Sequence, residues 1–217
     1  MTHQGELFSA APLDTLQFEK TVYRNGFTYV AGIDEAGRGP LAGPVMAAAV
    51  ILPVGLSING VDDSKKLTPD KREKLFEIIM AQALSVGVGI MSPAEIDRIN
   101  ILQATRRAML AAVQQLSPQP DYLLIDGISS IDSAVPQKTI KKGDSLSLSI
   151  AAASIIAKVT RDRLMIEMDL KYPGYGFAGH KGYGSAAHMD AIRRLGPSPI
   201  HRLTFGGVKE YVDCTFS

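Results

Sequence analysis

Acidic side chains stand at the ends of apolar segments in this sequence, and their placing points to metal-dependent chemistry. Asp34 and Glu35 lie within GIDEAGRGPLAGPV, Asp126 ends YLLID, and Asp144 follows two lysines in KKGDS. A buried charge has to be paired, neutralised or bound to metal, so acids at the ends of core strands need a partner. Two Mg²⁺ or Mn²⁺ ions would offset four carboxylates, and these hard cations prefer oxygen ligands. The four acids are therefore the candidate metal ligands.

The elements that position these acids are predicted from the apolar spacing. Strands are expected at 29–34, 44–52, 86–91, 122–126 and, as an edge strand, 137–141. Helices are expected at 69–83, from 93 onward, and at 101–116, 145–171 and 185–195. Strands come first with hairpin-like spacing, and later strands are separated by helices. The fold class is therefore α/β, with a mixed sheet covered by helices.

The geometry of such a sheet decides whether the acids can meet. If the strands that end at Asp34 and Asp126 are parallel neighbours, the two carboxylates lie side by side at the carboxyl edge, where α/β folds bind ligands. Asp34 and Glu35 would face opposite sides of a continued strand, so both serve one site only if the chain turns there. The GRGP that follows supplies a turn.

Each acid also has a structural explanation. Asp144 before a helix is a natural N-cap, and Asp126 before Gly127 is a common turn pair. The pair of Asp34 and Glu35 is harder to explain this way, because two acids at a buried strand end need compensation. The four together therefore favour a functional site.

Bulk properties limit the class of protein. With 217 residues, of which 46% are hydrophobic and 21% charged, the chain is long enough for one globular domain with a substantial core. A single cysteine, Cys214, excludes a disulfide framework within the chain and fits a reducing compartment. No signal peptide and no run of about 18 apolar residues occurs, so we expect a cytoplasmic protein without a membrane span. A monomer is the default expectation.

Positive charge is concentrated late in the sequence. Residues 171–202 contain five Lys or Arg and one acid, Asp190, which indicates either a solvated surface or a phosphate-binding face. His180, His188 and His201 lie in the same region without the spacing of a zinc site. These histidines are interpreted as phosphate contacts or as packing.

Five motifs, in order and with compatible spacing, resemble bacterial ribonuclease HII. They are GIDEAGRGPLAGPV at 32–45, DDSKKLT at 62–68, LLIDG at 123–127, KGDS with the helix to 163, and GHKGYG at 179–184. The resemblance covers residues 29–209. It implies a ribonuclease H-like fold, a mixed five-stranded sheet flanked by helices, with a helical C-terminal segment. The catalytic domain would span 28–210, between a weakly structured extension at 1–27 and a tail at 211–217.

The resemblance also implies a reaction and its catalytic groups. An enzyme of this family cuts the RNA of RNA–DNA hybrids and duplex DNA on the 5′ side of embedded ribonucleotides, leaving 3′-hydroxyl and 5′-phosphate ends. Catalysis would use two Mg²⁺ or Mn²⁺ ions. The family's four metal-binding and catalytic acids match Asp34, Glu35, Asp126 and Asp144.

The resemblance implies substrate-binding residues as well. Gly37, Arg38 and Gly39 match the GRG motif that recognises the 2′-hydroxyl of the ribonucleotide, the group by which a protein tells RNA from DNA. Tyr183 matches a tyrosine that packs on the adjoining deoxynucleotide. Lys181 would contact a backbone phosphate. A tyrosine in a loop is otherwise usually a half-buried packing residue.

Two hypotheses from other classes stay open at this level. The letters GDSL around Ser145 match the nucleophile motif of an esterase family, although the motif lies late in the chain and no Asp-x-x-His occurs. A non-catalytic binder of RNA–DNA hybrids is the second, and the intact acids oppose it because carboxylates repel phosphate unless metal intervenes. The spacing of Gly37, Gly39 and Gly43 departs by one residue from the dinucleotide-binding pattern.

Overall fold

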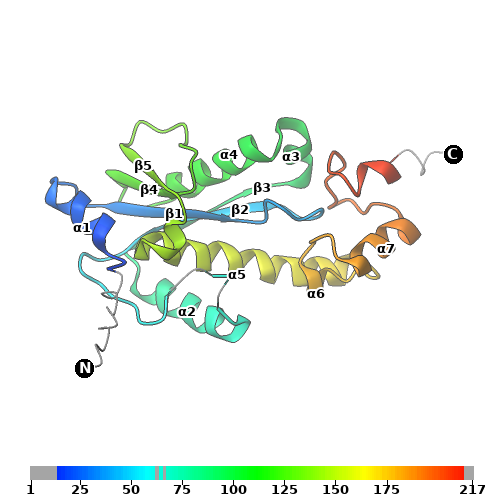
Figure 1. Ribbon diagram of the computed structural model, residues 1–217, viewed down its shortest axis with the longest axis horizontal. Coiled ribbons are helices and arrows are strands. Elements are labelled where there is room, and N and C mark those ends of the chain that lie inside the picture. The colour runs from blue at the N-terminus through cyan, green and yellow to red at the C-terminus, as the bar shows by residue number, and fades with distance from the viewer. Residues whose placement is uncertain (1–13, 62–63, 66, 213–217) are drawn as a thin grey trace, which may run out of the picture.

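The computed structural model describes residues 14–61, 64–65 and 67–212. Its centre is a five-stranded sheet in the order β3-β2-β1-β4-β5 (Figure 1). The strands are β1 Val30–Ala36, β2 Val45–Ile51, β3 Ser85–Met91, β4 Tyr122–Asp126 and β5 Gln137–Ile140. β1 pairs with β2 and β2 with β3 in antiparallel fashion, whereas β4 is parallel to both β1 and β5. The predicted mixed sheet is confirmed, including the parallel pairing of β1 with β4.

Helices lie before, between and after the strands. They are α1 Gln17–Arg24, α2 Pro69–Gln82, α3 Pro93–Ile99, α4 Ile101–Gln114, α5 Leu148–Lys171, α6 Phe177–His180 and α7 Ala186–Leu195, with 3₁₀ turns η1 Gly143–Ser145 and η2 Lys209–Tyr211. At the start of α2, α3 and α7, one backbone N–H of the first turn donates to a hydroxyl side chain, that of Thr68, Ser92 and Ser185 respectively. Each hydroxyl stands at the start of a helix that the sequence predicts, and it satisfies an amide that the helix itself leaves unbonded.

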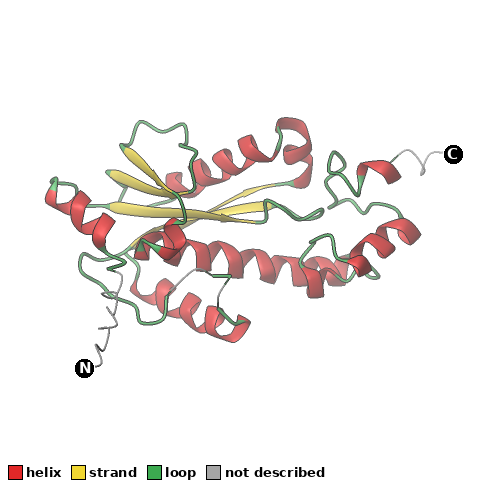
Figure 2. Ribbon diagram, viewed as in Figure 1, coloured by secondary structure: helices red, strands yellow, loops and turns green. Residues whose placement is uncertain are grey.

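The sheet is covered on both faces (Figure 2). Alternate residues of β2 point to opposite sides: Ala48 and Val50 pack with α2 and α5, whereas Ala47 and Ala49 pack with α4. α5 lies very close to β1, since a Cβ added to Gly32 would stand 2.1 Å from the carbonyl carbon of Ser149. The small buried residues of this helix, among them Ala152 and Ala153, permit that approach. Among the described residues, no helix has the length and apolarity needed to cross a bilayer.

The N-terminal segment differs from its expected description. Of the extension expected at 1–27, residues 14–27 are described, and they include α1, whose Val22 is buried with Val30 and Ile150. Glu19 of α1 is also buried and accepts hydrogen bonds from the hydroxyls of Ser147 and Ser149 at the start of α5. This stretch is therefore part of the folded domain. An amphipathic turn of only eight residues gives too weak a periodic signal to be separated from a loop.

The start of the long helix is also corrected. The sequence predicts a start at 145, with Asp144 as a possible N-cap, but α5 begins at Leu148 and its cap is Ser147. Asp144 instead lies in η1, a separate turn. Cys214 and three residues of the DDSKKLT motif, at 62, 63 and 66, lie outside the described residues.

Candidate active site

Three carboxylates meet at the carboxyl edge of the parallel strands. One oxygen from each of Asp34, Asp126 and Asp144 lies within 4.8 Å of the others. Ile33 pairs with Ile125 in register, so the next residues along β1 and β4 emerge side by side. Asp144 joins them from η1, because its neighbour Gly143 donates its backbone N–H to Oδ1 of Asp126 at 2.6 Å. Strand pairing and one turn therefore build the cluster.

Asp34 is the most buried of these acids. It follows Gly32 by two residues and faces α5 as that glycine does, with only 3% of its surface exposed. Burial raises the pKa of Asp34 well above its ordinary value, and the nearby charges of Glu35 and Asp126 raise it further. A hydrogen bond from Ser154 of α5 opposes this rise. The carboxylate is thus held in place while its charge remains largely uncompensated.

Glu35 belongs to the same cavity but not to the tight group of three. β1 continues to Ala36, so Glu35 points to the other side of the strand, where Arg38 donates to its Oε1 at 3.2 Å. Burial raises the pKa of Glu35, and the charge of Arg38 opposes that shift. A shared cluster would require a turn directly at the two acids, but the strand continues to Ala36 and the turn begins only at Gly37. Glu35 therefore lines the cavity without joining the group.

The donor set fits a hard divalent cation. All three clustered groups are carboxylates, and mutual repulsion of this kind is relieved by a divalent ion that leaves them ionised. A positive charge already stands near the cluster: Nζ of Lys65 is 3.5 Å from Oδ2 of Asp144. The Lys65 side chain is 76% exposed, so its contribution is screened by water. Asp34, Asp126 and Asp144 are the residues that could hold metal.

The cavity in front of the acids has a volume of about 200 Å³. Its wall combines Asp34, Glu35 and Asp126 with the 37–39 turn, Tyr183 and five further side chains: Ser64, Lys65, Ser154, Lys158 and Arg161. All five belong to two of the segments that carry the family resemblance, DDSKKLT and SIIAKVTRDR. The resemblance could have indicated these segments, but not which of their residues line the cavity.

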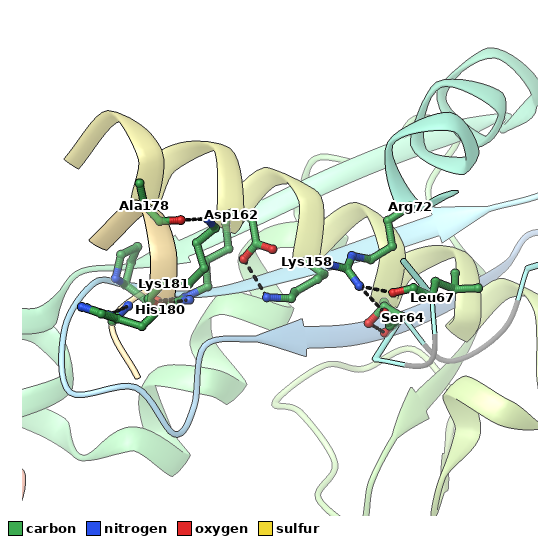
Figure 3. Close-up of polar contacts among 12 residues, drawn as sticks. Ser64, Leu67, Arg72, Lys158, Asp162, Ala178, His180 and Lys181 are labelled. Carbon is green, nitrogen blue, oxygen red and sulfur yellow. Dashed lines mark hydrogen bonds and ion pairs between the residues drawn. The ribbon is translucent and has the colours of Figure 1, made fainter. Parts of the chain in front are cut away.

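The loop that carries Ser64 is tied to α5 and α2. The hydroxyls of Ser64 and Ser154 are 2.8 Å apart, which links this loop to the residue that supports Asp34. Arg72 of α2 donates to the carbonyls of Ser64 and Leu67 (Figure 3). These bonds therefore hold Ser64 at one wall of the cavity.

Arg202 shapes the 37–39 turn. This fully buried guanidinium donates to the carbonyls of Gly37, Arg38 and Gly43. A trans peptide places its N–H opposite its C=O, so the N–H groups of Arg38 and Gly39 point away from Arg202. Gly37 has φ +93°, and a Cβ there would stand 2.1 Å from Nε of Arg161. Only glycine suits this position.

Arg161 ties the same segment to the loop that carries Tyr183. Its guanidinium, 1% exposed, donates to the carbonyls of Pro44, Ala42 and Lys181 at 3.0 to 3.1 Å. We call Arg161 and Arg202 the arginine clasp, since each bonds three main-chain carbonyls. Neither arginine is among the residues predicted from the sequence. Of the two, Arg161 is the one whose burial the sequence could have indicated, because it lies four residues, about one helical turn, after the buried Ala157 of α5.

The two remaining predicted residues lie at different distances from the acids. Tyr183 lines the cavity beside the turn, where a Cβ added to Gly39 would stand 3.7 Å from its ring, and 47% of this tyrosine is exposed. Lys181 lines a neighbouring hollow instead, together with Lys158, and its ammonium donates to the carbonyl of Ala178 (Figure 3). The structure therefore brings Tyr183 to the 37–39 turn and places Lys181 beside the cavity.

The histidines pack together. His188 and His201 are buried, and both rings contact Phe177 with centroids 5.5 and 5.6 Å away. His180 stacks on His188 at 4.3 Å. Of the two interpretations of these residues, the contacts support packing.

Comparison with known proteins gives a consistent result. The profile of the family described as Ribonuclease HII matches residues 31–208. Ribonuclease HII of Pelobacter propionicus is 68% identical over 214 residues, covering 99% of this chain and 98% of that protein. Ribonuclease HII of Geobacter metallireducens is 69% identical over 195 residues, covering 90% and 92%. The crystal structure of ribonuclease H2 from Pyrococcus horikoshii superposes with TM-score 0.71 at 29% identity, covering 86% of this chain and 98% of that one.

Proposed function

The chain belongs to the ribonuclease HII family, and on that premise we propose that this metal-dependent nuclease acts on two related substrates. It hydrolyses the RNA strand of RNA–DNA hybrids, and it cuts duplex DNA on the 5′ side of an embedded ribonucleotide. The observation that carries this proposal is the cluster of Asp34, Asp126 and Asp144 beside a turn with outward N–H groups. The acids would serve hydrolysis, and the turn would read the sugar.

The acids would hold two Mg²⁺ or Mn²⁺ ions, with Glu35 completing the set from the other side of β1. Such ions supply Lewis acidity, which activates water and stabilises the departing 3′ oxygen. The protein's part is to fix the carboxylates: Ser154 holds Asp34, and the backbone N–H of Gly143 holds Asp126. Hydrolysis of this kind leaves a 3′-hydroxyl and a 5′-phosphate without a protein nucleophile.

Recognition of RNA would come from the turn at Gly37, Arg38 and Gly39. The ribose 2′-hydroxyl both donates and accepts hydrogen bonds, and it is the group that separates RNA from DNA at one position. With two carbonyls of the turn held by Arg202, the N–H groups of Arg38 and Gly39 are available as fixed donors. The Tyr183 ring beside Gly39 would pack on the next deoxynucleotide.

The nucleic-acid backbone would be held by positive side chains around the cavity. Arg38, Lys65 and Lys158 line it, and Lys181 extends the positive surface into the neighbouring hollow. Phosphates attract such side chains independently of sequence. We further propose that the enzyme works as a monomer in the cytoplasm.

The test is cleavage of a DNA duplex that holds one ribonucleotide, with Mg²⁺, Mn²⁺ or EDTA, beside the Asp34→Asn variant. We expect a metal-dependent cut on the 5′ side, reduced by about a thousandfold or more in the variant. Asp132→Asn, the same change at an exposed acid, is the control and should cut normally. Folded wild-type protein that cuts neither this duplex nor a long hybrid with either metal would refute the proposal. An esterase that used Ser145 would act in EDTA.

A further inference from the structure

The loop that carries Tyr183 is fixed by a complete set of main-chain hydrogen bonds. The N–H of Lys181 donates to Phe177, that of Gly182 to the His180 ring, and that of Tyr183 to the His180 carbonyl. The three carbonyls accept in turn: that of Lys181 from Arg161, that of Gly182 from the N–H of Leu41, and that of Tyr183 from both the His188 ring and the N–H of Ser185. Two of these seven partners are imidazoles.

The histidine bonds form a chain whose direction is set by its ends. At one end the backbone N–H of Ser198 donates to Nδ1 of His201 at 2.8 Å, so that nitrogen carries no proton. At the other end Nδ1 of His188 lies 2.9 Å from the Tyr183 carbonyl, which can only accept. Nε2 of His201 and Nε2 of His188 are 3.0 Å apart. The one consistent assignment has His201 donating to His188, and His188 donating to Tyr183.

The surroundings keep both rings neutral, as this chain requires. Burial lowers the pKa of His188, and burial together with the charge of His188 lowers the pKa of His201 to about 4. His188 is 0% exposed and His201 2%, and both contact the buried Phe177 ring. The rings are therefore rigid, singly protonated and unable to rotate without losing a buried bond.

The histidine hydrogen bonds end at Tyr183, which is the exposed residue among the three, 181–183, whose main chain is bonded in this way. Tyr183 is 47% exposed and stands beside Gly39, whereas its backbone is fully bonded. We propose that His188, with His201 behind it, is a positioning residue that sets the place of the Tyr183 ring against the 37–39 turn, and so the enzyme's discrimination of a single embedded ribonucleotide. This inference rests on the proposed function of Tyr183 and assigns a role to residues outside the catalytic cavity.

Two substitutions of His188 separate the two halves of the chain. The amide nitrogen of His188→Asn can take the place of Nδ1 and keep the bond to Tyr183, whereas the amide of His188→Gln takes the place of Nε2 and keeps only the contact with His201. We expect His188→Gln to lower kcat/KM on the single-ribonucleotide duplex by about tenfold, with a smaller fall on a long RNA–DNA hybrid. His188→Asn should stay within about threefold of the wild type on both substrates.

A second measurement shows whether the effect passes through Tyr183. In a Tyr183→Ala background, His188→Gln should cause no further loss on the single-ribonucleotide duplex, because coupled residues are not additive. Equal losses in His188→Asn and His188→Gln, or an undiminished effect of His188→Gln in the Tyr183→Ala background, would overturn the proposal. Wild-type protein that fails to cut the duplex would refute the proposed function instead.

Thermal unfolding of each variant shows whether a loss of activity is a loss of folding. If His188→Gln does not fold, the partly exposed His180 gives an equivalent pair. His180→Asn can keep the acceptor for the N–H of Gly182, whereas His180→Gln cannot, so the same order of activities is expected on the single-ribonucleotide duplex. The reverse order would contradict the positioning role.

Discussion

The acid cluster and the arginine clasp are two buried groups of like charge that are compensated in opposite ways. In the cluster, the carboxylates of Asp34, Asp126 and Asp144 face one another. In the clasp, each guanidinium ends on three main-chain carbonyls, so the protein itself satisfies the charge. A buried charge without a partner is costly. The acid cluster can therefore accept a cation, whereas the arginine clasp uses its charge to fix the conformation of the backbone.

The pKa shifts describe the same difference. Burial first, and then neighbouring negative charges, raise the pKa of Asp34, so the metal-free cluster favours a proton. Burial, and then the charge of Arg161, lower the pKa of Arg202 to about 9, which still leaves the guanidinium charged at neutral pH. Removing charge should therefore stabilise the first region and destabilise the second.

The largest change in the free energy of unfolding is expected in the arginine clasp. Arg202→Met leaves the buried carbonyls of Gly37, Arg38 and Gly43 without their donor, and should lower the free energy of unfolding by about 3–5 kcal/mol. Urea-induced unfolding measures this. Arg194→Met, which removes an exposed arginine of α7, is the matched control and should cost less than about 0.5 kcal/mol. Equal losses would show that the clasp contributes no more than a surface pair.

The opposite sign is expected in the acid cluster. Asp34→Asn removes one of the mutually repelling charges and should raise the free energy of unfolding of the metal-free protein by about 1–2 kcal/mol, although it lowers cleavage by about a thousandfold or more. Unfolding in EDTA, followed beside Asp132→Asn, tests this. A variant less stable than the wild type in EDTA would mean that the hydrogen bonds of the Asp34 carboxylate outweigh the repulsion.

The same repulsion predicts a pH dependence. Because the pKa values of Asp34 and Glu35 are raised on folding, the native state keeps protons that the unfolded chain releases. The metal-free protein should lose stability as pH rises above the ordinary carboxyl values of 3.8 and 4.5, until both acids ionise in the native state. Mg²⁺ competes with these protons, so it should raise the unfolding temperature more at about pH 8 than at about pH 5. A rise in metal-free stability over this range would contradict the shifts.

The smallest effect on stability is expected at the edge of the turn. A Cβ at Gly39 would lie at an ordinary contact distance of 3.7 Å from the Tyr183 ring, so Gly39→Ala should change the free energy of unfolding by less than about 1 kcal/mol. The methyl group would nevertheless narrow the space between turn and ring, and should lower single-ribonucleotide cleavage by about tenfold. Gly37→Ala is the contrast, because its Cβ would overlap Arg161 and should destabilise the fold.

The sequence was informative wherever the signal is local. The hydroxyl caps at Thr68, Ser92 and Ser185 act through residues three positions away, and alternation along a strand is equally short-ranged. The meeting of Asp34 with Asp126 followed from one further assumption, parallel pairing, which the register confirms. These features need only the rules of helices and sheets.

The features that escaped prediction join distant segments. Arg202 bonds the carbonyl of Arg38, and Glu19 bonds Ser149, at separations of 164 and 130 residues. No periodicity encodes such contacts, and an arginine or glutamate is ordinarily a surface residue. The start of α5 was predicted too early for a related reason: a 3₁₀ turn and a helix cap have the same local composition, so Ser147 could not be chosen over Asp144 as the cap.

The distance between Arg38 and Arg202 has a consequence for synthesis of the chain. The N-terminal part of a protein leaves the ribosome first. Every acid of the cluster is therefore translated well before Arg202, the residue that holds the carbonyls of the 37–39 turn. A nascent chain that ends before Arg202 contains the proposed metal ligands but lacks the group that fixes the N–H donors proposed to read the sugar. On the proposed function, the capacity to distinguish RNA from DNA therefore depends on a residue that is translated after all of the acids.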